Sequence, residues 1–366
     1  AGASVGLGNI WRFPYLAAKY GGGIFLLVYI ILALTFGYTL IMAETSLGRM
    51  TRKSPVGAFE SFGNSRFISI GGWINAIIPI LIVPYYSVIG GWVIKYLIEY
   101  FAGHSKTLAG DAYFTTFISN GWSTEICFII FTLFTLGIIY AGVRNGIERV
   151  SKFMMPILIV LSLIIAVYSV TRPGAIEGVK YFLVPNFDHF SWMTVVSAMG
   201  QMFYSLSIAM GILITFGSYM KKDTSIEKST ENVEIFDTAI AIMAGLMIIP
   251  AVFAFSGGNA ETLKSGPALM FITIPKVFAN MGFGTAIGVV FFLLVLFAAV
   301  TSSIALTESA VSTFEDELHW SRKKSTVFMG MVMLLLGTLS CLGYGPLANF
   351  KILGMQFLDF FDFLPN

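Results

Sequence analysis

The chain has 366 residues, of which 56% are hydrophobic and 11% charged, with a net charge of +2 and a mean hydropathy of +0.81. Soluble domains carry roughly 25% charged residues, so this composition excludes a soluble protein and indicates a multi-pass protein in a lipid bilayer. The small net charge gives no reason to expect a nucleic-acid partner.

Apolar runs of the roughly 20-residue length that crosses a bilayer recur along the whole chain. They predict an all-α polytopic protein with spans near 1–20, 23–48, 70–101, 122–142, 147–171, 189–219, 235–257, 282–314 and 325–345. The long connections 102–121, 172–188 and 258–281 contain aromatic residues and proline, which favours ordered loops. Residue 1 already lies in an apolar run and 357–366 resembles the opening of another helix, so we expect a chain truncated at both ends.

Basic residues are concentrated in the loops after the second, fourth, sixth and eighth spans. These loops hold Arg49, Arg52, Lys53, Arg66, Arg144, Arg149, Lys152, Lys221, Lys222, Lys228, Arg322, Lys323 and Lys324. The positive-inside rule places such loops in the cytoplasm. We therefore predict a protein of the cell's inner (plasma) membrane with its basic loops cytoplasmic.

Two spans contain residues that weaken a helix. The first carries Gly2, Gly6 and Gly8 close together, and the sixth carries Ser205 and Ser207 between two glycines. Backbone groups freed by such breaks are tolerated at depth only where they face protein or water. Breaks in the first and sixth spans predict a 5+5 inverted repeat with a transport site at the midplane. The half-repeats are about 1–171 and 189–366 of a single domain, 1–366.

The start of the fifth span is another weak point, because Gly146 and Pro156 lie in it. Glycine loosens a helix and proline removes a backbone donor. This turn therefore either unwinds and admits water or is an ordinary helix boundary with a tolerated proline.

Several polar residues fall at membrane depth, where burying a polar group in hydrocarbon costs free energy and such residues are by default functional. Arg12 follows the first break and is read as a gate, with a structural ion pair as the alternative. Thr301 and Ser302 offer oxygen atoms to a cation, although small-residue helix packing explains them too. Asp237 lies in an apolar run, where it has little access to water unless it reaches the cytoplasmic rim.

Seven motifs in order give the chain a family resemblance. They are Gly6–Pro14, Gly21–Gly23, Glu44 with Gly48 and Arg49, Tyr85–Tyr86, Gly146–Arg149, Gln201–Ser207 and Thr301–Ser303. With them the chain resembles the neurotransmitter:sodium symporters, in particular the bacterial leucine, hydrophobic amino-acid and tyrosine transporters. The resemblance implies a leucine-transporter-like fold of the twelve-helix type, often eleven helices in bacteria, two sodium ions, no organic cofactor and an amino acid as substrate.

The resemblance also assigns site residues. One sodium ion would be held by Ser4, Asn9, Ser205 and Asp237 together with the substrate carboxylate. The other would be held by Gly2, Val5, Ala298, Thr301 and Ser302. The substrate would meet Ser4, Gly6, Gly8, Ile82, Tyr86, Tyr204, Ser205, Ser207, Ala209, Met210, Ser303 and Leu306, with Tyr86 on its carboxylate and Tyr204 as a lid.

Departures from the family pattern narrow the substrate. Monoamine-transporting relatives have an aspartate where this chain has Gly6, so the substrate is expected to bring its own carboxylate, as an α-amino acid does. Flexible Met210 suggests a hydrophobic or aromatic side chain, while Ala209, in place of a glycine, leaves the size limit open. Asp237 replaces an asparagine and supplies a fixed negative charge, which predicts chloride-independent transport.

The two gates are expected to be incomplete in this chain. Asp316 matches the acidic half of an internal gate, whose arginine would precede residue 1, and a solvated acidic loop is the alternative. The external partner of Arg12 is expected beyond residue 366.

The resulting prediction is a symporter, not an enzyme, that imports its substrate by alternating access. A channel fits two separate oxygen clusters and a closed apolar pocket less well. A hydrolase using Ser302 or Ser303 lacks a base, because His104, His189 and His319 fall in loops or at span ends. A non-transporting amino-acid sensor on the same fold stays open as an alternative.

Overall fold

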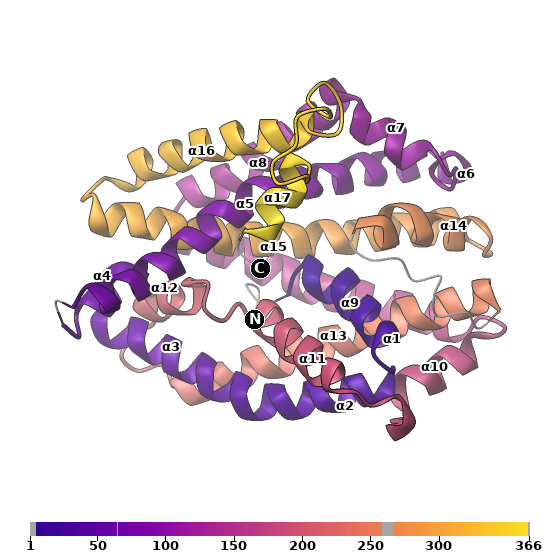
Figure 1. Cartoon of the computed structure of the whole chain (residues 1–366), viewed down its shortest axis with the longest axis horizontal. Helices are drawn as coiled ribbons and strands as arrows, with labels where there is room; N and C mark the ends of the chain where they lie inside the picture. The colour runs from indigo at the N-terminus through magenta and orange to yellow at the C-terminus, as the bar shows by residue number, and fades with distance from the viewer. Residues whose placement is uncertain (1–4, 64, 258–266, 365–366) are drawn as a thin grey trace.

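The computed structural model describes residues 5–63, 65–257 and 267–364, and in these residues helices account for nearly all regular structure. Two isolated β-bridges are present, and there is no strand in the described part. The long helices run side by side along the long axis of the molecule (Figure 1). Short helix α4 lies at one end of this bundle, and α6, α10 and α14 lie at the other. The predicted all-α architecture is confirmed.

Seven helices of the described residues are long and apolar enough to cross a membrane, and they coincide with seven predicted spans. They are α2–η2–α3 (Gly23–Leu32, Ala33–Gly37, Tyr38–Thr51), α5 (Arg66–Phe101), α8 (Gly121–Tyr140), η3–α9 (Val143–Glu148, Arg149–Val170), α13 (Ile226–Ser256), α15 (Gly284–Glu317) and α16 (Arg322–Leu342). Helix α13 begins well before the predicted residue 235. Its start is fixed by a polar cap, in which Ser225 Oγ accepts from Lys228 N at 3.2 Å, and hydropathy does not detect such a cap.

The predicted sixth span is interrupted in the structure. Helix α11 (Trp192–Ser205) ends where turns begin, and helix α12 (Ile212–Tyr219) resumes after them. Between the two helices, Ser207, Ala209 and Gly211 have φ angles of 57°, 61° and 68°. The left-handed conformation costs a non-glycine residue roughly 1–2 kcal/mol, and such strain is concentrated at functional sites.

The predicted first span contains the π-helix η1 (Gly8–Arg12) followed by α1 (Phe13–Lys19). Val5 and Gly6, ahead of η1, are not helical. Residues 1–4 lie outside the described part, so the segment before the expected break is not seen. The weak point of the fifth span is helical here, because η3 continues into α9 with Pro156 inside that helix. Its unwinding stays a prediction.

The predicted connections 102–121 and 172–188 contain helical segments, whereas 258–266 of the third predicted connection lie outside the described residues. The short helices of the described connections are α4 (Pro55–Glu60), α6 (Ser105–Leu108), α7 (Tyr113–Ser119), α10 (Ala175–Leu183), η4 (Phe187–His189), η6 (Leu269–Thr273) and α14 (Ile274–Ala279). A further short helix, α17 (Phe357–Phe363), follows α16.

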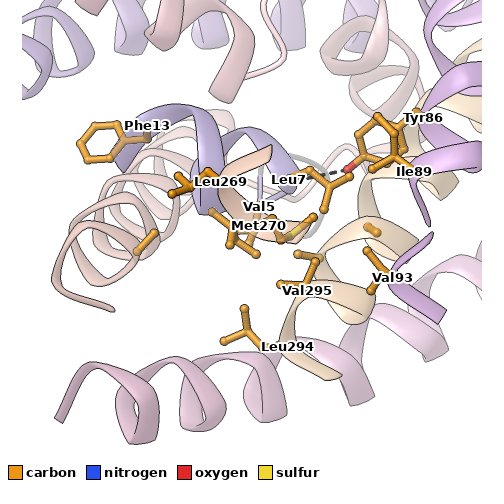
Figure 2. Close-up of a cluster of buried hydrophobic side chains, with 14 of the residues drawn as sticks. Val5, Leu7, Phe13, Tyr86, Ile89, Val93, Leu269, Met270, Leu294 and Val295 are labelled. Atoms are coloured by element: carbon orange, nitrogen blue, oxygen red, sulfur yellow. Dashed lines mark hydrogen bonds between the residues drawn. The ribbon is translucent and has the colours of Figure 1, made fainter. Parts of the chain in front are cut away.

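The start of the described chain is enclosed by apolar side chains. Val5 is fully buried and Leu7 is 1% exposed. Figure 2 shows these two residues between Val93 of α5, Val295 of α15 and Met270 of η6. Leu7 N also donates a hydrogen bond to Tyr86 Oη at 3.3 Å. This packing fixes the non-helical backbone of Val5 and Gly6 against α5 and α15.

Glycines allow α3 and α12 to pack with their backbones close together. A Cβ atom on Gly48 would lie 1.9 Å from the Ile214 carbonyl oxygen, and one on Gly217 would lie 2.4 Å from the Thr45 carbonyl oxygen. Backbone atoms cannot move aside as a flexible side chain can. Helix α12, which carries one edge of the interrupted segment, is therefore positioned by its contact with α3.

We predict that Gly48→Ala destabilises the protein by about 1–3 kcal/mol, the usual cost of overpacking. The measurement is the thermal unfolding midpoint of the detergent-purified protein. Gly137→Ala in α8 is the matched control, since no atom lies within 4 Å of its added Cβ position. Equal midpoints for both variants would show that the contact between α3 and α12 is not rigid.

Candidate functional site

Three cavities surround the interrupted segment and share lining residues. The central cavity shares Tyr86 and Tyr204 with one larger cavity and Ser207 and Ile212 with another. The second of these lies on the side of the basic loops. We name the two the external and the cytoplasmic cavity, after the orientation predicted from the basic loops. The central cavity has a volume of about 40 Å³, whereas the other two have about 420 Å³ each. A narrow space therefore lies between two larger ones.

The central cavity is lined by residues from the start of the chain, α5, the α11–α12 region and α15. They are Gly6, Leu7, Gly8, Asn9, Ile82, Tyr86, Tyr204, Ser205, Ser207, Met210, Ile212, Ser302 and Leu306. Most of the substrate residues predicted from sequence are in this set. Ala209 and Ser303 are not, and Ser4 lies outside the described residues.

Local geometry explains why Ala209 and Ser303 are elsewhere. Ala209 has a positive φ and is exposed, and its N–H donates to Glu44 Oε1 at 2.8 Å. Ser303 is fully buried and accepts a hydrogen bond from Thr135 of α8 at 3.3 Å. Both residues were assigned by the family resemblance, which carries residue positions but not the direction of each side chain, and their role at the substrate stays a prediction.

A buried oxygen cluster forms around Asp237, which has no exposed surface. Asn9 Nδ2 donates to Asp237 Oδ1 at 2.8 Å and to Ser205 Oγ at 2.8 Å. Ser205 Oγ donates to Asp237 Oδ1 at 2.7 Å. Three residues that are far apart in sequence and were assigned to one sodium ion are thus in mutual contact.

Tyr29 of α2 also belongs to this cluster, and the sequence reasoning missed it. Its hydroxyl donates to Asp237 Oδ2 at 2.8 Å. Both carboxylate oxygens therefore accept hydrogen bonds, as a buried charge requires. Tyrosine is common in membrane proteins, so nothing in the sequence distinguishes Tyr29 from the others.

A second oxygen cluster lies where Val5 meets α15. Thr301 Oγ1 lies within hydrogen-bond distance of the Phe297, Ala298 and Val5 carbonyls, at 3.0, 3.1 and 3.3 Å. Ser302 Oγ donates to the Val5 carbonyl at 3.1 Å. Hydroxyl and carbonyl oxygens are the ligands that alkali cations need. Gly2, the remaining residue predicted for this sodium ion, lies outside the described residues.

Polar side chains satisfy the backbone freed between α11 and α12. Besides the bond from Ala209 to Glu44, Gly211 N donates to Asn75 Oδ1 at 3.2 Å. Gln201 Nε2 donates across to the Gly8 carbonyl at 3.2 Å, which joins the two weakened segments. Asn75 was missed, and Glu44 was noted only as part of a motif. The signal for Glu44 was available, since a carboxylate inside a span is by default functional.

The external cavity contains the predicted gate residue Arg12. The Arg12 guanidinium lies 4.8 Å from the ring centroid of Tyr204, a favourable cation–π distance. Asp359 and Asp362 of α17 line the same cavity. Acidic side chains of the chain itself therefore face the space that Arg12 lines, and the position of its gate partner stays a prediction.

On the side of the basic loops, Asp316 Oδ2 accepts a hydrogen bond from Ser54 N at 2.9 Å, just before α4. Its predicted role in an internal gate stays a prediction. A stronger polar contact, missed from the sequence, joins α15, α16 and α12. Fully buried Glu308 binds Arg322 Nη2 at 2.5 Å and Nη1 at 3.0 Å, and it accepts from the Tyr219 hydroxyl at 2.7 Å.

An all-helical membrane bundle with a strained interruption beside a small polar cavity, between two larger cavities, has the architecture of a membrane transporter. The model of the sodium:neurotransmitter symporter family matches residues 1–128 and 115–362. The chain belongs to this family. It is therefore an integral membrane protein and a sodium-dependent symporter of a small-molecule substrate, and the family consists of transporters rather than enzymes.

Individual relatives agree with this assignment. YhdH of Bacillus subtilis (strain 168), an uncharacterised sodium-dependent transporter, is 35% identical across 99% of this chain and 80% of its own length. A sodium-dependent transporter of Haemophilus influenzae is 32% identical across 99% of this chain and 82% of its own length. The dopamine transporter of Bos taurus is 25% identical across 96% of this chain and 57% of its own length.

A solved structure shows the same fold. The crystal structure of MhsT in complex with L-phenylalanine matches with a TM-score of 0.88 and 36% sequence identity, and it covers 100% of this chain and 83% of that one. The predicted leucine-transporter-like fold is confirmed.

We predict that Arg322→Gln destabilises the protein by up to about 3–5 kcal/mol, because it leaves the buried Glu308 carboxylate without its cationic partner. The double variant Glu308→Gln/Arg322→Gln should recover much of the loss, since no buried charge remains. Thermal unfolding of the detergent-purified single and double variants provides the comparison. A double variant that is no more stable than Arg322→Gln would contradict this account.

Proposed function

We propose that this protein imports a hydrophobic or aromatic L-amino acid together with sodium by alternating access, independently of chloride. The observation that carries the proposal is the small central cavity, which meets two larger cavities across shared side chains and has both oxygen clusters at its edge. A path closed at its centre suits a transporter that occludes its substrate better than a continuous pore. We also propose two inverted half-repeats, about 1–171 and 189–366, in a plasma membrane with the basic loops cytoplasmic.

Two sodium ions would occupy the two oxygen clusters. The cluster of Asn9, Ser205 and Asp237 includes a carboxylate, while the cluster of Val5, Ala298, Thr301 and Ser302 offers only neutral oxygens. The first cluster joins η1 to α11 and α13, and the second joins non-helical Val5 to α15. Sodium binding would therefore hold the broken segments in one arrangement and couple ion binding to substrate binding.

The substrate carboxylate would lie near Gly6 and Tyr86. Tyr86 Oη accepts from Leu7 N, which leaves the phenolic proton for another acceptor such as a carboxylate. Gly6 has no side chain to fill this space, since a Cβ atom there would lie 3.3 Å from Tyr86 Oη. An amine-binding aspartate is thus absent, and an α-amino acid supplies the missing anion itself.

The side chain of the substrate would displace apolar groups. A volume of about 40 Å³ is close to the roughly 30 Å³ share of one water molecule, so the cavity must widen to admit an amino acid. Met210 and Leu306 line it, and methionine adapts its shape readily. The binding of L-phenylalanine by MhsT supports a hydrophobic or aromatic substrate here.

Asp237 supports chloride independence. Its carboxylate already accepts the hydrogen bonds of Tyr29, Asn9 and Ser205, and it supplies a fixed negative charge beside the proposed sodium ion. A chloride ion at this place would meet a like charge at short range.

The direct test is uptake into proteoliposomes under an inward sodium gradient, with each of the twenty amino acids as a competitor and with chloride replaced by gluconate. We expect saturable, sodium-dependent uptake that a few hydrophobic or aromatic amino acids inhibit and that persists without chloride. Binding without accumulation would show a sensor, and current without substrate would show a channel.

Asp237→Asn should lower sodium affinity at least tenfold in chloride-free buffer, because it removes the only carboxylate of the cluster. Added chloride should restore part of the uptake. Glu227→Gln, at the exposed first turn of the same helix, is the control and should leave uptake unchanged. Wild-type-like uptake by Asp237→Asn would refute the assigned role of Asp237.

Gly6→Ala should raise the KM for substrate at least tenfold, since its methyl group would lie 2.4 Å from Ser302 Oγ and occupy space proposed for the carboxylate. Gly200→Ala in α11 is the control, because no atom lies within 4 Å of its added Cβ position. An unchanged KM for Gly6→Ala would place the carboxylate elsewhere.

A further inference from the structure

A separate apolar groove lies between α8 and α9, away from the three cavities of the transport site. These helices follow each other in the chain, but α8 packs on α5, α15 and α16, whereas α9 packs on α13 and α15. The two helices therefore pack against different neighbours beyond η3. The groove that remains has a volume of about 570 Å³, and its lining residues are Ile94, Ile130, Phe131, Phe134, Arg149, Val150, Phe153, Met154, Leu296, Phe297 and Val300.

The groove opens to the outside of the bundle at membrane depth. Phe134 is 54% exposed and Phe153 is 66% exposed, and both belong to helices that cross the membrane. Large apolar side chains with this exposure face lipid hydrocarbon in an integral membrane protein. The floor is formed by buried Val300 of α15 and its neighbours. Such a groove favours an acyl chain, because nothing in its apolar wall binds a polar ligand.

One positively charged side chain, that of Arg149, lines the groove. Arg149 begins α9, on the side of the basic loops, and it is the groove's single charged residue. Among the described residues it makes no hydrogen bond or ion pair through its side chain, and the nearby Lys152 is paired with Glu148 at 2.6 Å. An apolar groove that is also lined by an unpaired guanidinium is complementary to a lipid that has an anionic headgroup. Basic pockets between transmembrane helices on this side bind such headgroups.

We propose that this groove binds one anionic phospholipid of the leaflet next to the basic loops, with its phosphate at Arg149 and an acyl chain between α8 and α9. The bidentate geometry of guanidinium suits phosphate. The acyl chain covers Phe134 and Phe153 and fills the gap that α8 and α9 leave over α15.

The test uses the fluorescence of a tryptophan placed in the groove. Phe153→Trp keeps an aromatic ring at the mouth, and the protein is reconstituted into phosphatidylcholine vesicles that contain a minor fraction of phosphatidylglycerol. Dibrominated acyl chains, which quench nearby tryptophan, are carried either by the phosphatidylglycerol or by an equal fraction of the phosphatidylcholine. The same protein without Phe153→Trp gives the background from the native tryptophans.

We expect the added tryptophan to be quenched preferentially by brominated phosphatidylglycerol, with about a fivefold preference in apparent affinity, the factor that corresponds to roughly 1 kcal/mol per basic residue at an anionic surface. Arg149→Gln in the Phe153→Trp background should abolish the preference. Lys152→Gln, which removes an equal charge three residues along the same helix and outside the groove lining, should preserve it.

Each other outcome overturns the proposal. Equal quenching by both lipids would show an unselective lipid belt, and no quenching by either would show a groove closed to acyl chains. A preference that survives Arg149→Gln, or that disappears with Lys152→Gln as well, would show attraction to the basic surface as a whole. Circular dichroism of each variant verifies that the helices are retained.

Discussion

The hydrocarbon of a lipid bilayer contains no water that could hydrogen-bond to backbone groups freed from a helix. The interruption between α11 and α12 therefore depends on hydrogen bonds that the protein itself supplies. Side chains from two other helices accept hydrogen bonds from this segment. Glu44 of α3 accepts from the Ala209 N–H, and Asn75 of α5 accepts from the Gly211 N–H. Each partner fixes one point of the turn relative to the bundle. The strained φ angles at Ser207 and Ala209 persist because the surrounding contacts determine them.

Hydrogen bonds of the same kind connect the two weakened segments, and they indicate where cations would bind. Gln201 joins α11 to the Gly8 carbonyl, while Asn9 joins η1 to Ser205 and Asp237. Polar groups of η1, of the end of α11 and of α13 thus converge beside the interrupted segment. This arrangement is the one described for midplane sites of transporters built from repeats. A ligand that binds there contacts several segments at once, so its binding can change their relative positions.

Hydropathy and polar residues at depth predicted much of this arrangement. The spans followed from apolar length, and Asp237 stood out because carboxylates are rare in hydrocarbon. Asn9 and Ser205 were assigned to the same sodium ion by the family resemblance. Tyr29 did not stand out, since its partner Asp237 lies 208 positions away in sequence. The acidic residues Asp359 and Asp362 were recognised only as the start of a helix, and their position beside Arg12 depends on how α17 packs on α5 and α16. Long-range packing of this kind has no local sequence signal.

The start of α9 lies between two very different environments. Val143, Ile147, Glu148 and Ser151 line the cytoplasmic cavity that shares Ser207 with the central one. Arg149, Val150, Phe153 and Met154 line the groove on the opposite, lipid-facing side. Short π-helical turns are rare and often mark functional positions, and η3, which contains Gly146, occupies this place. Because this segment lines both spaces, a change in its helical form would alter the shape of the cavity and the shape of the groove together.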